Sequence, residues 1–179
     1  MTNRQEFRVL ETFRDFEIRE YQPCVIAEVA VPAEYSEASS RAFSSLFGYI
    51  SSGNKNSEKI SMTAPVISAQ KPNDSGTWYV SFVMPAGSRF ENMPKPNDAK
   101  VILRDLDSEM CVAQSFRGKA SAELSKKMEE QLRAAGAREN LTLSAETRIC
   151  RFDPPFKPGF LQYNEIVIPI SLPLEKSGL

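Results

Sequence analysis

Histidine is missing from all 179 positions of this sequence. Its absence excludes Ser-His-Asp and Cys-His catalytic pairs and removes the commonest nitrogen ligand of metal sites. Acid–base catalysis would need a carboxylate, a tyrosine or a cysteine whose pKa is shifted by its surroundings, and nothing in the sequence indicates such a shift. The sequence therefore gives no catalytic residue and no metal ligand, and it favours a non-enzymatic function.

Cysteine is scarce, and basic and acidic side chains are nearly equal in number. The three cysteines, Cys24, Cys111 and Cys150, are an odd number without C-x-x-C spacing, so we expect buried thiols rather than disulfides or a zinc site. With 22 basic and 23 acidic side chains, no basic block could follow a phosphate backbone, and nucleic acid is not an expected partner.

Long hydrophobic runs are also missing. No stretch approaches the roughly 20 apolar residues of a spanning helix, and the first residues lack the basic start and apolar core of a signal peptide. We therefore expect a soluble, cytoplasmic protein without membrane contact.

What the sequence does contain is the composition of one globular domain over residues 1–179, with 41% hydrophobic and 25% charged residues. Two similar halves, about 7–85 and 99–170, are separated by a proline- and asparagine-rich linker at 85–98. Each half has the pattern strand, strand, helix, strand, strand. The predicted strands are 16–21, 25–31, 59–69 and 78–84 in the first half, and 101–106, 110–116, 147–152 and 163–170 in the second.

Two helical segments lie between the strand pairs. Apolar residues recur at three- and four-residue steps from Tyr35 to Ile50, and Gly53 is expected to end this helix. A narrower apolar stripe runs from Leu124 to Ala135, with Gly136 expected at its end. The pattern predicts an α+β fold: a distorted antiparallel eight-stranded β-barrel, built from a duplicated β-α-β-β unit and flanked by two α-helices, because closure removes exposed strand edges.

Several short motifs occur in a fixed order over most of the chain: FEIREYQP at 16–23, KISMTAPV at 59–66, DPPFKP at 153–158 and NEI at 164–166. Together they resemble the SOUL (haem-binding protein) family. The resemblance implies the same distorted barrel, and it implies binding of haem or another tetrapyrrole in an apolar groove between the first helix and a loop near the C-terminal strands.

A flat macrocycle with two propionates needs apolar and aromatic contacts together with cations at the rim. The residues that could supply them are Arg41, Phe43, Leu46, Phe47 and Ile50 in the first helix, Met62 in the KISMTAPV motif, and Phe156, Lys157 and Phe160 in the loop. Lys157 matches the basic loop residue that the family resemblance implies for the propionates. Without histidine, haem iron would be unligated by the protein or ligated by cysteine, tyrosine or methionine.

Other interpretations stay open. The helix stripe could be core, DPPFKP could be a rigid turn, and Lys157 could simply be solvated. The duplicated architecture also resembles effector-binding, gyrase-inhibitor-like modules, which implies binding of other hydrophobic or cationic small molecules and leaves a hydrolase open. Glu165 or Glu28 in an acidic cavity would favour cationic ligands. A protein-interaction domain with an unknown partner is the third alternative, and an exposed apolar patch over a filled cavity would favour it.

Overall fold

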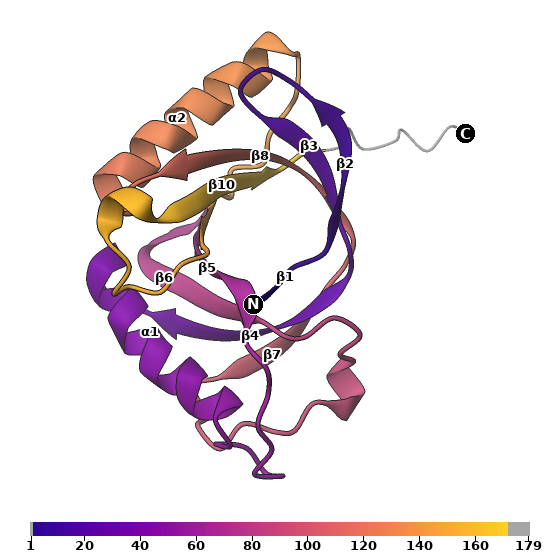
Figure 1. The fold of residues 1–179 in the computed structure, drawn as a ribbon, viewed down its shortest axis with the longest axis vertical. Helices are drawn as coiled ribbons and strands as arrows, with labels where there is room; N and C mark the ends of the chain where they lie inside the picture. Colours follow the sequence, from indigo (N-terminus) through magenta and orange to yellow (C-terminus); the bar gives the residue numbers. More distant parts are fainter. Residues whose placement is uncertain (1, 172–179) are drawn as a thin grey trace.

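A computed structural model describes residues 2–171, which form one curled sheet with two helices on its outside (Figure 1). The helices are α1 Tyr35–Ile50 and α2 Ala122–Arg138, with short 3-10 turns η1 Phe90–Asn92 and η2 Gly159–Leu161. The strands are β1 Asn3–Arg4, β2 Phe7–Thr12, β3 Glu17–Tyr21, β4 Cys24–Val31, β5 Thr63–Lys71, β6 Asp74–Val83, β7 Ile102–Leu106, β8 Glu109–Arg117, β9 Arg148–Arg151 and β10 Tyr163–Pro169.

The predicted fold class is confirmed, with two differences. The sheet has ten strands rather than eight, because β1 and β2 precede the first predicted strand. Its order is β2-β3-β8-β10-β9-β5-β6-β4-β7, with β1 added to β5, so the described strands curl into a half-barrel whose end strands do not pair. All these pairs are antiparallel except β1 with β5.

The two halves of the chain exchange strands. Strand β3 of the first half pairs with β8 of the second half, and β7 of the second half pairs with β4 of the first. The centre of the order is the pair β5·β9, which again joins the halves. Neither half can therefore complete its sheet from its own strands.

The helix α1 has the predicted bounds, and its buried residues pack on β4 and β6. At its end the positive φ (108°) belongs to Ser52, not to Gly53. Gly53 instead provides close approach: its N–H donates to the carbonyl oxygen of Gly48 at 2.9 Å, and a Cβ at this position would lie 2.5 Å from that oxygen.

The helix α2 begins as a capped helix and ends later than predicted. The hydroxyl of Ser121 accepts a hydrogen bond from the N–H of Leu124 at 3.2 Å. The expectation that Gly136 ends the helix is wrong, because the helix continues to Arg138. Gly136 is buried where a Cβ would lie 3.0 Å from Leu143 Cδ1, so this glycine makes room for a neighbouring side chain.

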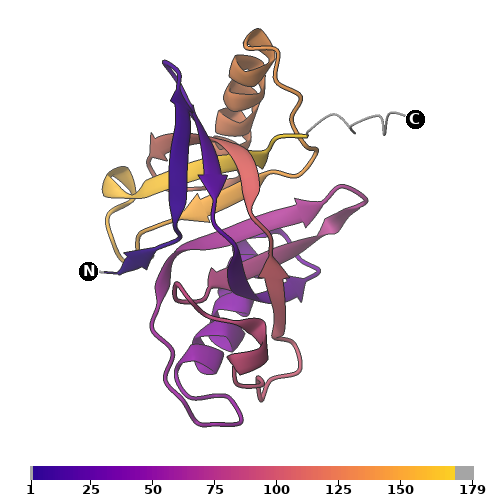
Figure 2. The same cartoon turned by 90° about the vertical axis from the view of Figure 1, so that its right-hand side faces the viewer.

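The helices cover the outer, convex face of the sheet, one over each half of it (Figure 2). One core lies under α1 and includes Leu46, Val80 and Phe82, and a second lies under α2 and includes Ile149 and Ile166. The inner, concave face carries a third, smaller cluster around Ile67 and Cys150. No helix among residues 2–171 is long and apolar enough to cross a membrane.

The linker at 85–98 is anchored rather than free. Tyr49 Oη, at the end of α1, donates a hydrogen bond to the carbonyl oxygen of Pro94 at 2.8 Å. Backbone hydrogen bonds from Lys55 to Lys95 and from Asn97 to Gly53 fix the same segment against the turn after α1. The linker therefore packs against the first half of the chain.

Candidate functional site

One edge of α1 presents two stacked aromatic rings. The rings of Phe43 and Phe47 lie 5.7 Å apart at 12°, and the two residues are 39% and 50% exposed. Phe43 also packs edge-on against Phe82 of β6, at 5.7 Å between ring centroids. The pair thus connects an open apolar surface to the outer face of the sheet, which is an arrangement suited to a flat apolar ligand.

Leu46 and Ile50 lie behind this edge. Both are buried in the core between α1 and the sheet, so they hold the helix in place rather than face outward.

Arg41 does not join the aromatic edge. Residues two positions apart on an α-helix point about 200° away from each other, so Arg41 and Phe43 lie on opposite edges of α1. Arg41 forms an ion pair with Glu37 one turn earlier. It lines a shallow recess near the start of α1 together with Glu34 and Gln70.

The loop between β9 and β10 carries the other two predicted rings. Phe156 and Phe160 are 87% and 77% exposed. Lys157 Nζ forms an ion pair with Asp153 Oδ1 at 2.9 Å, and Asp153 Oδ2 accepts the backbone N–H of Tyr163 at 2.7 Å. The backbone hydrogen bond and the lysine lower the pKa of Asp153, so this carboxylate stays charged and Lys157 has a partner within its own loop.

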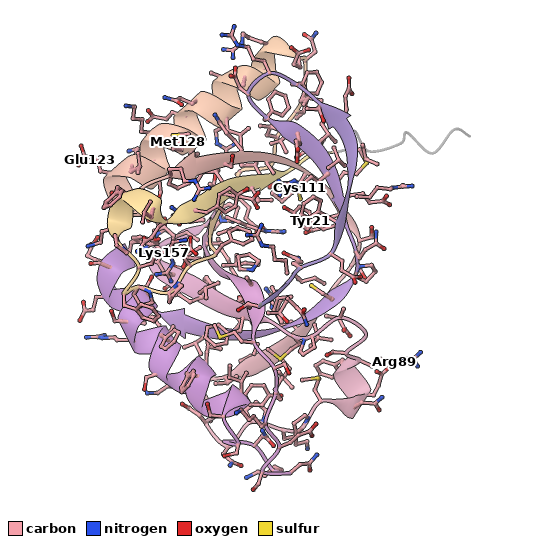
Figure 3. The ribbon with its side chains drawn as sticks, viewed as in Figure 1. Tyr21, Arg89, Cys111, Glu123, Met128 and Lys157 are labelled. Carbon is pink, nitrogen blue, oxygen red and sulfur yellow. The ribbon has the colours of Figure 1, made fainter. Side chains whose placement is uncertain are left out.

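Met62 is half-exposed in the segment that enters β5. In Figure 2 this segment and the loop after β9 both run along the left-hand side of the molecule. The side chain of Lys157 lies on the side of the sheet where the helices are, whereas Tyr21 and Cys111 lie inside the curl (Figure 3).

A residue that the sequence reasoning missed lies between the helix edge and the loop. Val66 of β5 is directly opposite Phe82 on one side and Arg151 of β9 on the other. Because paired residues share a face, Arg151 lies on the outer face, two strand spacings or about 10 Å from Phe82. The sequence carries no signal for this residue, because its place on the outer face depends on the register between β5 and β9.

The inner face holds a small, enclosed cavity of about 70 Å³ whose lining includes Arg19, Tyr21, Tyr163 and Glu165. Arg19 donates to both oxygens of Glu165, at 3.0 and 2.7 Å, and the Tyr163 hydroxyl donates to Oε2 at 2.9 Å. Both partners of this ion pair are buried. Burial raises the pKa of Tyr21, which therefore stays a neutral phenol beside the pair.

The first residues of the chain close this cavity. The guanidinium of Arg4 lies 4.9 Å from the ring centroid of Phe152 and 5.4 Å from that of Tyr163. The ring of Phe7 covers Arg19 at 4.0 Å. These contacts fix the N-terminal segment across the inner face.

The second acid that could favour cationic ligands, Glu28, is also paired. Its Oε2 accepts from Arg104 at 2.9 Å and from the hydroxyl of Ser81 at 3.3 Å. Glu165 and Glu28 each have an arginine partner, so neither is an unneutralised anion.

The cysteines are spread along the sheet. Cys111 and Cys150 are buried and Cys24 is half-buried, all as free thiols. Burial raises the pKa of all three, to about 12 for Cys111, so they are protonated near neutral pH. Among residues 2–171, no cluster of three or more acidic or cysteine side chains is arranged to hold a metal ion.

A family described as "SOUL heme-binding protein" matches residues 2–169. The mouse protein named heme-binding protein 2 is 30% identical over 122 residues, which are 65% of this chain. The matched part is 58% of the mouse protein, so the chain spans little more than half the length of this relative.

Two solved structures share the fold at low sequence identity. The C-terminal domain of EcmrR is 12% identical with a TM-score of 0.67, and the match covers 87% of this chain and 96% of that one. The structure of SAV2435 bound to tetraphenylphosphonium is 11% identical with a TM-score of 0.55, covering 88% and 94% of the two chains. At these identities the likeness concerns the fold alone.

Proposed function

The chain belongs to the SOUL haem-binding protein family, and we propose that it binds haem or another tetrapyrrole without carrying out a reaction on it. The observation that carries the proposal is the stacked, exposed pair Phe43 and Phe47 on the edge of α1. Two exposed rings in contact form an apolar surface that a flat macrocycle can cover.

The remaining predicted residues have supporting roles in this proposal. Met62, in the segment before β5, and Phe156 and Phe160, in the loop after β9, add exposed apolar side chains, while Leu46 and Ile50 fix the helix from the core. Arg41 lies on the other edge of the helix, and Lys157 is paired with Asp153, so their electrostatic contribution to a ligand is reduced. Without an axial histidine, apolar contact supplies most of the affinity, and iron-free and iron-containing porphyrins are expected to bind similarly.

The test is a titration of haemin and of iron-free protoporphyrin, followed by porphyrin absorbance and by quenching of Trp78. Phe47→Glu places a charge on the proposed surface and should weaken binding of both porphyrins by ~10-fold or more, since a bound macrocycle would cover that charge and remove it from water. Phe90→Glu is the matched control, because Phe90 is similarly exposed but lies in η1. Absence of saturable binding, or equal effects of the two variants, contradicts the proposal.

A second candidate function is the binding of hydrophobic cations at the inner face. The supporting observation is that the rings of Phe152 and Tyr163 already hold the guanidinium of Arg4. The structural neighbour SAV2435 is described with tetraphenylphosphonium bound. If this candidate is correct, Arg4→Ala should tighten tetraphenylphosphonium binding, because the internal cation no longer competes, and an unchanged affinity would refute it.

A further inference from the structure

Four polar atoms at the start of α1 and on the neighbouring strands β5 and β9 are buried without a hydrogen-bond partner: Tyr35 Oη, Ser39 Oγ, Ser68 Oγ and Arg151 Nε. The residues Tyr35, Ser39 and Ser68 are only 7%, 8% and 0% exposed. A buried donor left unpaired costs about 1–3 kcal/mol, so several of them on one face point to a shared polar partner.

Register places the two sheet residues together. Ser68 of β5 is opposite Ile149, and Arg151 of β9 is opposite Val66, so Ser68 and Arg151 are diagonal neighbours on the outer face. Diagonal neighbours in antiparallel sheets lie about 7–8 Å apart between Cα atoms, which is within reach of a long side chain.

The helix residues approach the same place from above. Tyr35 and Ser39 are one turn apart at the start of α1, and both face the sheet. The pKa of Tyr35 is raised by burial and lowered by the charge of Arg151, so the phenol and the guanidinium lie within electrostatic reach of each other. Tyr35 and Ile149 belong to the same core cluster, between the sheet and α2.

The charge of Arg151 is not neutralised by any residue of the described chain. Arg151 forms no ion pair there, whereas the two cations predicted for the ligand rim, Arg41 and Lys157, each pair with a carboxylate four residues earlier. A partly buried guanidinium without an anion is costly, and a carboxylate with parallel oxygens matches its donors.

We propose that Arg151, with the hydroxyls of Tyr35, Ser39 and Ser68, binds a carboxylate group of the ligand. This inference rests on the proposed function and specifies it: the apolar body lies on Phe43 and Phe47, and one propionate reaches Arg151. The row Phe82, Val66, Arg151 sets a distance of about 10 Å between Phe82, on which Phe43 packs, and Arg151. The ligand class is therefore a flat, apolar molecule with a carboxylate on a short arm.

The experiment compares protoporphyrin IX with its dimethyl ester, which keeps the macrocycle and removes both negative charges. Each is titrated into the wild-type protein, Arg151→Gln and Arg89→Gln. The wild type should prefer the free acid, and Arg151→Gln should weaken the acid by ~10- to 100-fold, the value of one charged hydrogen-bonded pair, while leaving the ester unchanged. Arg89→Gln is the matched control, because Arg89 is an exposed arginine at the start of η1, away from both helices (Figure 3), and it should leave the affinity for the acid unchanged.

Thermal unfolding shows whether Arg151→Gln folds. If it does not, two further variants test the same site. Tyr35→Phe keeps the ring that packs on Trp78 and removes only the hydroxyl, and Ser68→Ala removes the second hydroxyl. Each should lower the preference for the acid by ~3- to 10-fold without changing the affinity for the ester.

The outcomes separate the two proposals. If the wild type binds acid and ester equally and none of these variants changes the ratio, the carboxylate site is refuted and tetrapyrrole binding stands. If the wild type binds neither porphyrin, the proposed function fails and the carboxylate site fails with it.

Discussion

The most buried charges of the molecule belong to Arg19 and Glu165 on the inner face. Their two direct hydrogen bonds, with Tyr163 donating to the same carboxylate and Tyr21 accepting from the same guanidinium, satisfy most of the polar atoms of the pair. A buried pair of this kind offsets its own desolvation cost only while both partners are present.

Glu165→Gln should therefore lower the free energy of unfolding by about 3–5 kcal/mol, because it leaves the charge of Arg19 buried without its bidentate partner. Urea denaturation followed by Trp78 fluorescence measures the change. The double variant Arg19→Met with Glu165→Met should recover most of the loss. A single variant within 1 kcal/mol of the wild type would show that the pair is not buried in solution.

The thiol of Cys111 makes the free energy of unfolding depend on pH in the alkaline range. Burial raises its pKa to about 12 in the native state, from an ordinary value of 9.0. Above about pH 9 the unfolded chain releases this proton while the native chain keeps it, so stability present below pH 9 is lost as the pH rises toward 12, by about 1.4 kcal/mol per pH unit. Urea midpoints from pH 7 to 11 should fall more steeply for the wild type than for Cys111→Ala, and parallel curves would contradict the assignment.

At the scale of the element, the end of α1 depends on two glycines with opposite requirements. Gly48 lies within the helix with no atom near the position of its missing Cβ, whereas a Cβ on Gly53 would collide with the carbonyl oxygen of Gly48. The first glycine only lowers helix propensity, and the second permits the chain to turn back over the last turn.

Gly48→Ala should stabilise the protein by about 0.5–1 kcal/mol, because alanine is the better helix former at an unobstructed position. Gly53→Ala should destabilise it by about 1–3 kcal/mol, because the backbone must move to avoid overpacking. Thermal unfolding of the two variants measures both changes, a higher melting temperature for Gly48→Ala and a lower one for Gly53→Ala. Destabilisation by both would show that Gly48 is also constrained.

The elements that could be predicted from the sequence are those whose buried apolar residues recur at a regular spacing. The bounds of α1 were predicted because its apolar residues recur regularly, whereas β2 was missed because its six residues are all exposed. The end of α2 was wrong because Gly136 serves side-chain packing rather than termination. Arg151 could not be found, since its lack of a partner depends on strand register and on the approach of Tyr35.

At the scale of the molecule, strand exchange between the halves determines how the chain can fold. Because β3 pairs with β8 and β7 with β4, each half contributes strands to a sheet segment that the other half completes. We expect one cooperative unfolding transition rather than two.

Fragments 1–99 and 100–179 should each lack stable structure alone and should assemble when mixed, because each one leaves the exchanged strands unpaired. The cut after Ala99 keeps the contact between Tyr49 and Pro94. Far-UV circular dichroism of the separate and mixed fragments measures this. A folded fragment 1–99 would show that the first half is an independent unit.

The half-barrel has two edge strands, β2 at one end of the sheet and β7 at the other. An unpaired strand is a template for another chain, and long flat margins lead to aggregation. Here β2 is interrupted by a shift in register between Val9 and Glu11, and the adjacent residues Arg104 and Asp105 place opposite charges on β7. The half-barrel can therefore leave both edge strands exposed, because the bulge in β2 and the charges on β7 disfavour edge-to-edge pairing between copies of the chain.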